Sequence, residues 1–265
     1  MREITIGQYY PGNSIIHRLD PRVKIIGTLV FIISLFCFNS FFGYVVATIF
    51  LATCIILSQV PFGYMVRGLK AIFFLLMITV VINMFMIKGE PLVSLGRFSI
   101  SKEGVRTAAF MALRLVYLIL GSSILTLTTT PNTLTDALEK LMGPLKKIKV
   151  PVHEIAMMMS IALSFIPILV EETDKIMKAQ MARGADFESK NIMKKVQSYV
   201  PVLVPLFISA FRRANDLAMA MEARCYHGDE GRTKMKPLVY KSRDYVAYAI
   251  LIVYFICCIV AGRLF

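Results

Sequence analysis

Two short motifs of nearly the same sequence contain the residues best suited to recognising a partner protein. They are Ala182-Arg183-Gly184 and Ala223-Arg224-Cys225. The guanidinium of arginine is a planar fork of donors that binds a carboxylate through two parallel hydrogen bonds. Each arginine therefore suits a carboxylate-lined groove on another protein. The alternative is a structural role, because arginine in the last turn of a helix and a glycine after it are common helix-ending signals.

Patterns typical of catalysis do not occur in the sequence. There is no G-x-x-x-x-G-K-[ST] loop to hold a phosphate, and the pair His153-Glu154 does not extend to H-E-x-x-H. The histidines His17, His153 and His227 lie far apart and lack companions at ligand spacing. The sequence therefore predicts no catalytic residue, no metal site and no bound cofactor. A membrane enzyme with an unfamiliar active site stays open as an alternative.

Each arginine motif ends a segment that is predicted to be a long helix. One helix is expected from Pro151, a favourable first residue, to about Ala182, and the other from Lys190 to about Arg224. Each is apolar in its first half and charged in its second. At ~30 residues each helix would be ~45 Å long, which is more than a connecting loop needs. A shorter amphipathic helix is expected over Thr135–Leu145.

The composition is that of a membrane protein. Hydrophobic residues make up 57% of the chain and the mean hydropathy is +0.66, whereas soluble domains are about 45–50% apolar. The net charge is +13, from 30 Lys+Arg against 17 Asp+Glu. In a membrane protein this excess of positive charge indicates which loops face the cytoplasm, because Lys and Arg gather on the cytoplasmic side. Nucleic-acid binding is the weaker alternative, since no motif for it appears.

Five membrane spans are expected from the apolar runs. No charged residue occurs from Ile25 to Val60, and this run is too long for one helix across a ~30 Å hydrocarbon core. The polar and small residues of Asn39–Gly43 divide it in two. A short strand pair around Leu92–Ser101 is expected on the outer side, between the third and fourth spans. The five spans are about 23–39, 42–60, 70–87, 108–129 and 245–262.

The segment 131–244 is predicted to stay in the cytoplasm. Its apolar runs, Ile155–Val170 and Tyr199–Phe211, are short and interrupted by proline, which is more typical of buried or interfacial helices than of spans. If both runs crossed, the basic loop between them would lie outside, against the positive-inside rule. The expected domains are 1–130, with the N-terminal lead and four spans, 131–244, the coupling domain, and 245–265, the last span.

The predicted fold class is therefore an all-α polytopic membrane protein. It has about five transmembrane helices and a cytoplasmic helical coupling domain with two long helices. No acidic residue lies inside the five expected spans, whereas ion-coupled carriers keep such residues near the membrane midplane. The membrane part is therefore expected to be a scaffold, and the energy for transport is expected to come from a partner protein. A stand-alone secondary transporter or channel is the alternative.

Three features carry a resemblance to a known family. Gly7–Lys24 matches the family's opening pattern, the paired Ala-Arg-Gly motifs are its most specific mark, and Gly231-Arg232-Thr233 is also similar. Over nearly its whole length the chain resembles EcfT, the transmembrane T component of energy-coupling factor (ECF) transporters in the CbiQ/EcfT family. These are ABC-type importers of vitamins and metals. The chain departs at Cys225, which replaces the glycine of the second motif, so a changed helix cap is expected there.

The resemblance implies a non-catalytic, multi-pass subunit of the bacterial cell membrane with a cytoplasmic N-terminus. It would bind two ATPase subunits, EcfA and EcfA′, and a membrane S component that captures the substrate, but no nucleic acid. ATP would be bound by the ATPases, with Arg183 and Arg224 in grooves on the two. When ATP closes the ATPase pair, the long helices would change their crossing angle, and the S component would release a vitamin inward. A dedicated cobalt or nickel system is the alternative within the family.

The resemblance also implies a surface for the S component on the apolar face of 155–170. Methionine re-packs at low cost, so a surface rich in methionine can accept several S components. Core filling is the alternative role. The residues expected to form this surface are Met157, Met158, Met159, Ala162 and Phe165.

Overall fold

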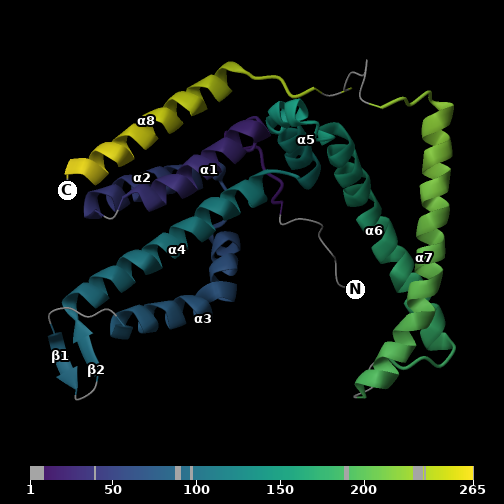
Figure 1. Ribbon diagram of the computed structural model, residues 1–265, viewed down its shortest axis with the longest axis horizontal. Helices are drawn as coiled ribbons and strands as arrows, with labels where there is room; N and C mark the ends of the chain where they lie inside the picture. Colours follow the sequence, from purple (N-terminus) through teal and green to yellow (C-terminus); the bar gives the residue numbers. More distant parts are fainter. Residues whose placement is uncertain are drawn as a thin grey trace. The chain divides into compact units, whose positions relative to one another are not determined.

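The chain folds into two compact helical units, seen in the computed structural model of Figure 1. The bundle unit comprises Gly7–Ala137 and Leu238–Phe265, and the long-helix unit contains Leu138–Pro237. The predicted domain limits at 131 and 244 lie near these boundaries, and the cytoplasmic placement of the segment between them stays a prediction. The structure describes residues 9–38, 40–86, 91–95, 98–187, 191–228, 235 and 237–264.

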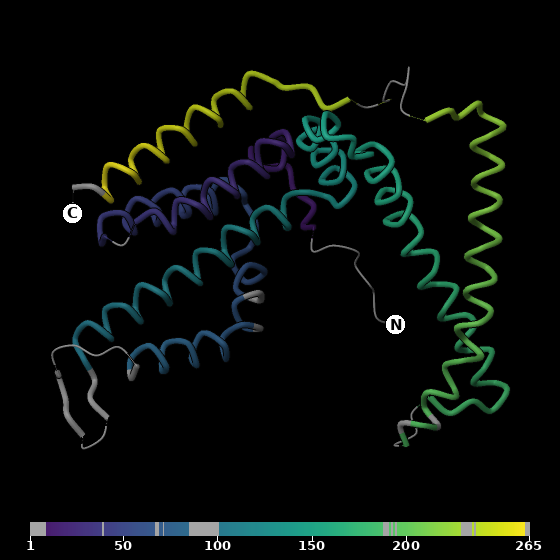
Figure 2. Tube along the Cα trace, viewed as in Figure 1, coloured from purple at the N-terminus to yellow at the C-terminus, as the bar shows by residue number. Residues whose placement is uncertain are grey.

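Helices of the bundle unit begin at polar caps and pack side by side. Asp20 caps α1, Ser40 caps α2 and Ser101 caps α4, each through its side chain, because the first N–H groups of a helix have no partner within it. α8 contacts α1 and α2, and α4 contacts α1, α2 and α3 (Figure 2). The helices wholly within this unit are α1 (Pro21–Cys37), α2 (Phe41–Ser58), α3 (Phe62–Met86), α4 (Lys102–Thr128) and α8 (Ser242–Leu264), and the limit of the unit falls within α5 (Pro131–Leu141).

The expected strand pair is confirmed between α3 and α4. β1 (Pro91–Leu95) and β2 (Phe98–Ser101) pair antiparallel, with Leu95 opposite Phe98 and Val93 opposite Ile100. Ser101, the last residue of β2, is also the residue that caps α4. The hairpin therefore leads directly into the next long helix.

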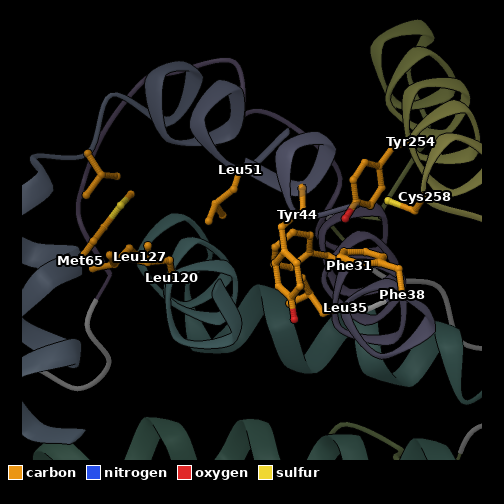
Figure 3. Close-up of a cluster of buried hydrophobic side chains, with 12 residues drawn as sticks. Phe31, Leu35, Phe38, Tyr44, Leu51, Met65, Leu120, Leu127, Tyr254 and Cys258 are labelled. Carbon is orange, nitrogen blue, oxygen red and sulfur yellow. The ribbon is translucent and has the colours of Figure 1, made fainter. Parts of the chain in front are cut away.

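Aromatic side chains form the centre of the bundle unit (Figure 3). The ring of Tyr254 from α8 stacks on Phe50 of α2, with centroids 4.1 Å apart, and its hydroxyl lies 2.8 Å from the Ser34 hydroxyl of α1. Gly121 allows α4 to approach α1, because a Cβ at this position would stand 2.6 Å from the ring of Phe31. The core thus joins residues from all four of these helices.

Buried polar contacts join the beginnings of α1 and α8. One oxygen of Asp244 accepts the backbone N–H of Asp20 at 2.9 Å, and the other accepts the backbone N–H of Lys241 at 2.8 Å. Arg22 donates to the Asp20 carboxylate and lies 3.8 Å from the ring centroid of Tyr240. Burial alone would raise the pKa of Asp20, but the hydrogen bonds and charge of Arg22 outweigh it and hold that pKa below its ordinary value.

Substituting Asp244→Asn tests this joint. The side chain is only 1% exposed, and an amide would turn a donor toward one of the two N–H groups, leaving a buried donor unpaired. We expect a loss of about 2 kcal/mol of stability, as is typical of one unsatisfied buried group. Thermal unfolding in detergent micelles measures it, with Asp174→Asn at an exposed position of α6 as control. Equal midpoints for the two variants would contradict the assignment.

Four helices of the described residues are long and apolar enough to cross a membrane: α2, α4, α6 (Val152–Ala182) and α8. This confirms an all-α polytopic membrane protein. Two of the expected spans have shorter apolar helices than these four: α1 has 17 residues, and the apolar part of α3 is Ile72–Met84. By its length and composition, α6 is also able to cross a membrane. The basic loop after α6 is the argument against its crossing, and its placement stays a prediction.

Candidate functional site

The two predicted long helices are confirmed. α6 runs over Val152–Ala182 and α7 over Ile192–Ala223, so the arginine motifs lie at the C-terminal end of each (Figure 1). The shorter predicted helix is divided, because α5 already begins at Pro131 and a 3-10 helix over Gly143–Ile148 follows it. α6 and α7 contact each other within the long-helix unit.

The first arginine motif is a complete helix-ending turn. Arg183 is the cap residue, and Gly184 follows with φ of +89°. The N–H of Gly184 donates to the carbonyl of Met181 at 2.9 Å, and that of Ala185 donates to the carbonyl of Gln180 at 3.0 Å. This pair of bonds is the Schellman motif, which needs a left-handed residue where the glycine stands.

The second motif has the same turn without a glycine. Arg224 is the cap residue, and Cys225 takes the left-handed position with φ of +56°. The N–H of Cys225 donates to the carbonyl of Glu222 at 2.9 Å, and that of Tyr226 to the carbonyl of Met221 at 3.1 Å. The prediction of a changed cap at Cys225 is therefore wrong. The hydrogen-bond pattern imposes the backbone conformation, and the cysteine adopts it at a steric cost of about 1 kcal/mol.

This strain gives a stability prediction of unusual sign. Cys225→Gly should stabilise the chain by about 0.5 kcal/mol, because the relief of the left-handed strain exceeds the added chain entropy of glycine. Ala220→Gly, one turn earlier on an exposed helical position, should instead destabilise it by about 0.5–1 kcal/mol. Denaturant titration in mixed micelles, followed by circular dichroism, compares the two. A loss of stability in both variants would contradict the strain.

Both motif arginines are exposed and available to a partner. Within the described parts of the chain, neither Arg183 nor Arg224 forms an ion pair or a side-chain hydrogen bond. The loop after Arg183 is held by Phe187, which is 9% exposed and packs edge-on against Tyr199 of α7, with centroids 5.4 Å apart. Each guanidinium therefore belongs to the cap residue of a long helix, and the turn after the first one is anchored to α7.

The expected apolar surface on α6 is only partly one face. Residues on a helix are about 100° apart, so Met158, Ala162 and Phe165 lie on one side, with Met159 at its edge. Met158 is 59% and Met159 41% exposed, and Ala162 is also exposed. Met157 is half-buried and lies toward a different side of the helix. The structure thus places four of the five predicted residues on or beside one side of α6; three of them are exposed, and Phe165 is half-buried.

A second exposed apolar surface lies on α7; the first half of this helix was expected from the sequence to be apolar, but none of its residues was singled out as a surface. The run Tyr199–Phe211 was expected to be buried or interfacial rather than spanning, and its apolar residues recur every three or four positions and share one side of the helix. That spacing was the available signal. We call this surface the α7 stripe; its exposed residues are Val196, Val200, Leu203, Val204, Phe207, Ile208 and Phe211.

Little else in the described residues suggests chemistry. No group of three or more His, Cys, Asp or Glu side chains among them is placed to hold a metal ion. The family-like segment Gly231-Arg232-Thr233 lies outside the described residues, as do Gly7 and Gln8 of the opening pattern. What the site offers is two exposed arginines and two apolar helix faces, which suits the binding of proteins.

Comparison with known proteins agrees with this description. The profile of the CbiQ family, described as cobalt transport protein, matches residues 12–235. The energy-coupling factor transporter transmembrane protein EcfT of Clostridium kluyveri is 58% identical over 249 residues, covering 93% of this chain and 92% of the relative. EcfT of Thermosediminibacter oceani is 56% identical, with 94% of each chain covered, and EcfT of Bacillus subtilis is 48% identical, with 96% of each covered.

Proposed function

Because this chain belongs to the EcfT proteins of the CbiQ family, the transmembrane components of energy-coupling factor transporters, we propose that it transmits ATP-driven motion. Two cytosolic ATPase subunits would supply the motion, and a substrate-binding S component in the membrane would receive it. The chain itself would be non-catalytic, with ATP bound by the ATPases. Its N-terminus and the segment 131–244 would lie in the cytoplasm of a bacterial cell.

The observation that carries this proposal is the repetition of one turn at two helix ends. Arg183 and Arg224 each occupy the cap position of the same hydrogen-bonded turn, although the residues after them differ. Both guanidinium groups are exposed and lack an ion pair within the described residues. Two exposed arginines in the same local structure are suited to two similar binding sites on partner proteins. A guanidinium that forms two parallel hydrogen bonds is suited to a carboxylate-lined groove. A pair of related ATPase subunits meets this requirement.

The apolar half of α6 would carry the movement to the S component. Met158, Met159 and Ala162 are exposed there, and a large exposed apolar face typically marks a protein or lipid contact. When the two ATPases close on ATP, their grooves would shift the ends of α6 and α7. The resulting change in the crossing angle of α6 and α7 would then displace the apolar face, and with it the S component.

The transported substrate would be chosen by the S component. A vitamin is our first proposal, which follows from the resemblance of the sequence to ECF importers; the names of the relatives give the class of transporter and no substrate. The description of the family as cobalt transport proteins makes a metal ion the second. In either case this chain would contribute coupling rather than substrate recognition.

Reconstitution tests the proposed function. The chain would be co-expressed with two ATPase subunits and an S component from one source and placed in liposomes with radiolabelled B vitamins or cobalt ions as probes. We expect uptake that requires ATP on the side of the membrane where the ATPases lie and that is absent for the purified chain alone. Flux through the chain alone would favour a secondary transporter or channel and overturn the coupling proposal.

The cytoplasmic placement of the segment 131–244 gives a separate prediction. In a background without the native cysteines, Lys178→Cys at an exposed position of α6 should resist an impermeant maleimide added to intact cells, and should react in inside-out vesicles. Phe41→Cys, which is 66% exposed and lies at the expected outer connection, is the control that should label in intact cells. Labelling of the α6 cysteine from outside would mean that α6 crosses the membrane.

A further inference from the structure

Two polar side chains of α7 converge on one carboxylate of α6. The Ser209 hydroxyl donates to Oε1 of Glu172, and the guanidinium of Arg213 donates to Oε2 over 3.1 Å. Ser209 and Arg213 are one turn apart, so they lie on the same face of α7. Both oxygens of the carboxylate are thus held from a single face of the neighbouring helix, which fixes how α7 is rotated and shifted against α6.

This contact contributes more to geometry than to stability. The side chains of Glu172 and Arg213 are 23% and 40% exposed, and ion pairs that reach solvent add little to the free energy of folding. A carboxylate bound at both oxygens is nevertheless directional, because each hydrogen bond weakens steeply when its angle changes. The contact therefore resists sliding of the two helices past each other, and a change in their crossing angle would be centred on it.

The space beside this contact would allow the crossing angle of α6 and α7 to change. A hollow of about 250 Å³ lies beside the contact, lined by Ile168, Glu171, Glu172, Lys175 and Arg213. Each helix also contains a proline within about a turn and a half before the contact, at Pro167 in α6 and Pro205 in α7. A proline removes one backbone hydrogen bond of the helix and favours bending there. Each helix is therefore easier to bend near the contact that joins the two helices.

Along α6, the contact lies about midway between Arg183 and Ala162 of the exposed apolar face. Arg183 lies about three turns after Glu172, or ~16 Å along the axis at about 1.5 Å per residue. In the other direction, Ala162 of the exposed apolar face lies ~15 Å before Glu172. On α7, Arg224 follows Arg213 by the same three turns as Arg183 follows Glu172. A rotation of α6 about the contact would therefore move the Arg183 end and the apolar face in opposite directions, with Pro167 lying between the contact and that face.

We propose that Glu172, Ser209 and Arg213 are positioning residues that form the pivot between α6 and α7. They convert movement of the two arginine ends into movement of the apolar face of α6. The pivot itself is a property of these two helices, and only its role in transport rests on the proposed function. A partner that displaces the helix ends acts through it.

The test measures the distance between spin labels on the two helices. Labels at Lys178→Cys and Met219→Cys, in a background without native cysteines, lie the same number of residues beyond Glu172 and Arg213 on exposed positions. In the chain alone, Glu172→Gln should broaden the distance distribution. In the complete transporter it should abolish the ATP-dependent shift in distance and lower ATP-driven uptake about tenfold, while binding of the ATPases and ATP hydrolysis continue.

The neighbouring carboxylate supplies the matched control. Glu171 pairs at 2.7 Å with Lys175 on its own helix, so Glu171→Gln removes the same charge without touching α7 and should leave the distribution unchanged. Arg213→Lys, which keeps the charge but removes the Nη2 donor that reaches Oε2, should resemble Glu172→Gln, and the exchange Glu172→Arg with Arg213→Glu should restore a narrow distribution. If Glu172→Gln and Glu171→Gln give the same distribution, the pivot is refuted. A wild-type chain that binds no ATPase would instead refute the proposed function, while the measurement on the chain alone still decides the pivot.

Discussion

Reversing both motif arginines, Arg183→Glu with Arg224→Glu, should abolish ATP-driven uptake. If each guanidinium is received by carboxylates, the substitution replaces an attraction by a repulsion at each of the two ATPase interfaces. Removing one partner of a desolvated charge pair typically costs about 2–5 kcal/mol, which corresponds to at least about 30-fold weaker binding at each interface. Because both interfaces are weakened together, the ATPases should no longer co-purify with the chain.

The control for this prediction reverses the same charges elsewhere on the same helices. Lys178→Glu with Arg212→Glu changes the net charge equally, at exposed positions of α6 and α7. We expect this variant to keep both ATPases and most of its uptake. The single variants at Arg183 and Arg224 would show whether the two interfaces are equivalent. Normal uptake by a well-expressed Arg183→Glu, Arg224→Glu variant would remove the basis of the coupling proposal.

Local signals in the sequence were sufficient to place the two long helices. Pro151 precedes the first residue of α6, and α6 ends one residue before Arg183, which Gly184 follows in a left-handed turn. Proline at the start and glycine after the end are signals that act within a few residues. The same reasoning failed at Cys225, because glycine was taken as necessary for the turn. The backbone hydrogen bonds can impose a left-handed conformation on another residue when the helix gains more than the strain costs.

Contacts between distant parts of the chain could not be predicted in this way. The hydrogen bond from Asp20 to Asp244 joins residues 224 positions apart, and the sequence contains no period or spacing that pairs them. The same is true of Glu172 with Ser209 and Arg213, which come from different helices. Helix periodicity shows which residues share a face, but the pairing of faces depends on packing. The α7 stripe follows from helix periodicity, but its residues were not singled out, although one helix through both prolines was predicted from the sequence.

A single charge in the exposed apolar face of α6 should separate the two kinds of partner. Ala162→Asp introduces a carboxylate between Met158 and Phe165, on the side that we assign to the S component. If a partner covers this face, the carboxylate loses its water without gaining a counter-charge, and burial of an unpaired charge costs several kcal/mol. We expect the S component to be absent from the purified complex and uptake to fall at least about 100-fold, while both ATPases remain bound.

Ser164→Asp is the matched control, because Ser164 is exposed on the opposite side of the same turn, about 200° away around the helix. It places the same carboxylate at nearly the same depth, so any effect of charge on the membrane or on helix stability is shared by the two variants. Retention of the S component should therefore differ between them if the face recognises a partner. Equal retention would show that this side of α6 is not the docking surface, and the α7 stripe would be the next surface to test. Loss of the ATPases as well, from Ala162→Asp alone, would show that the face holds the long-helix unit in its fold, since Arg183 and Arg224 are untouched by the substitution.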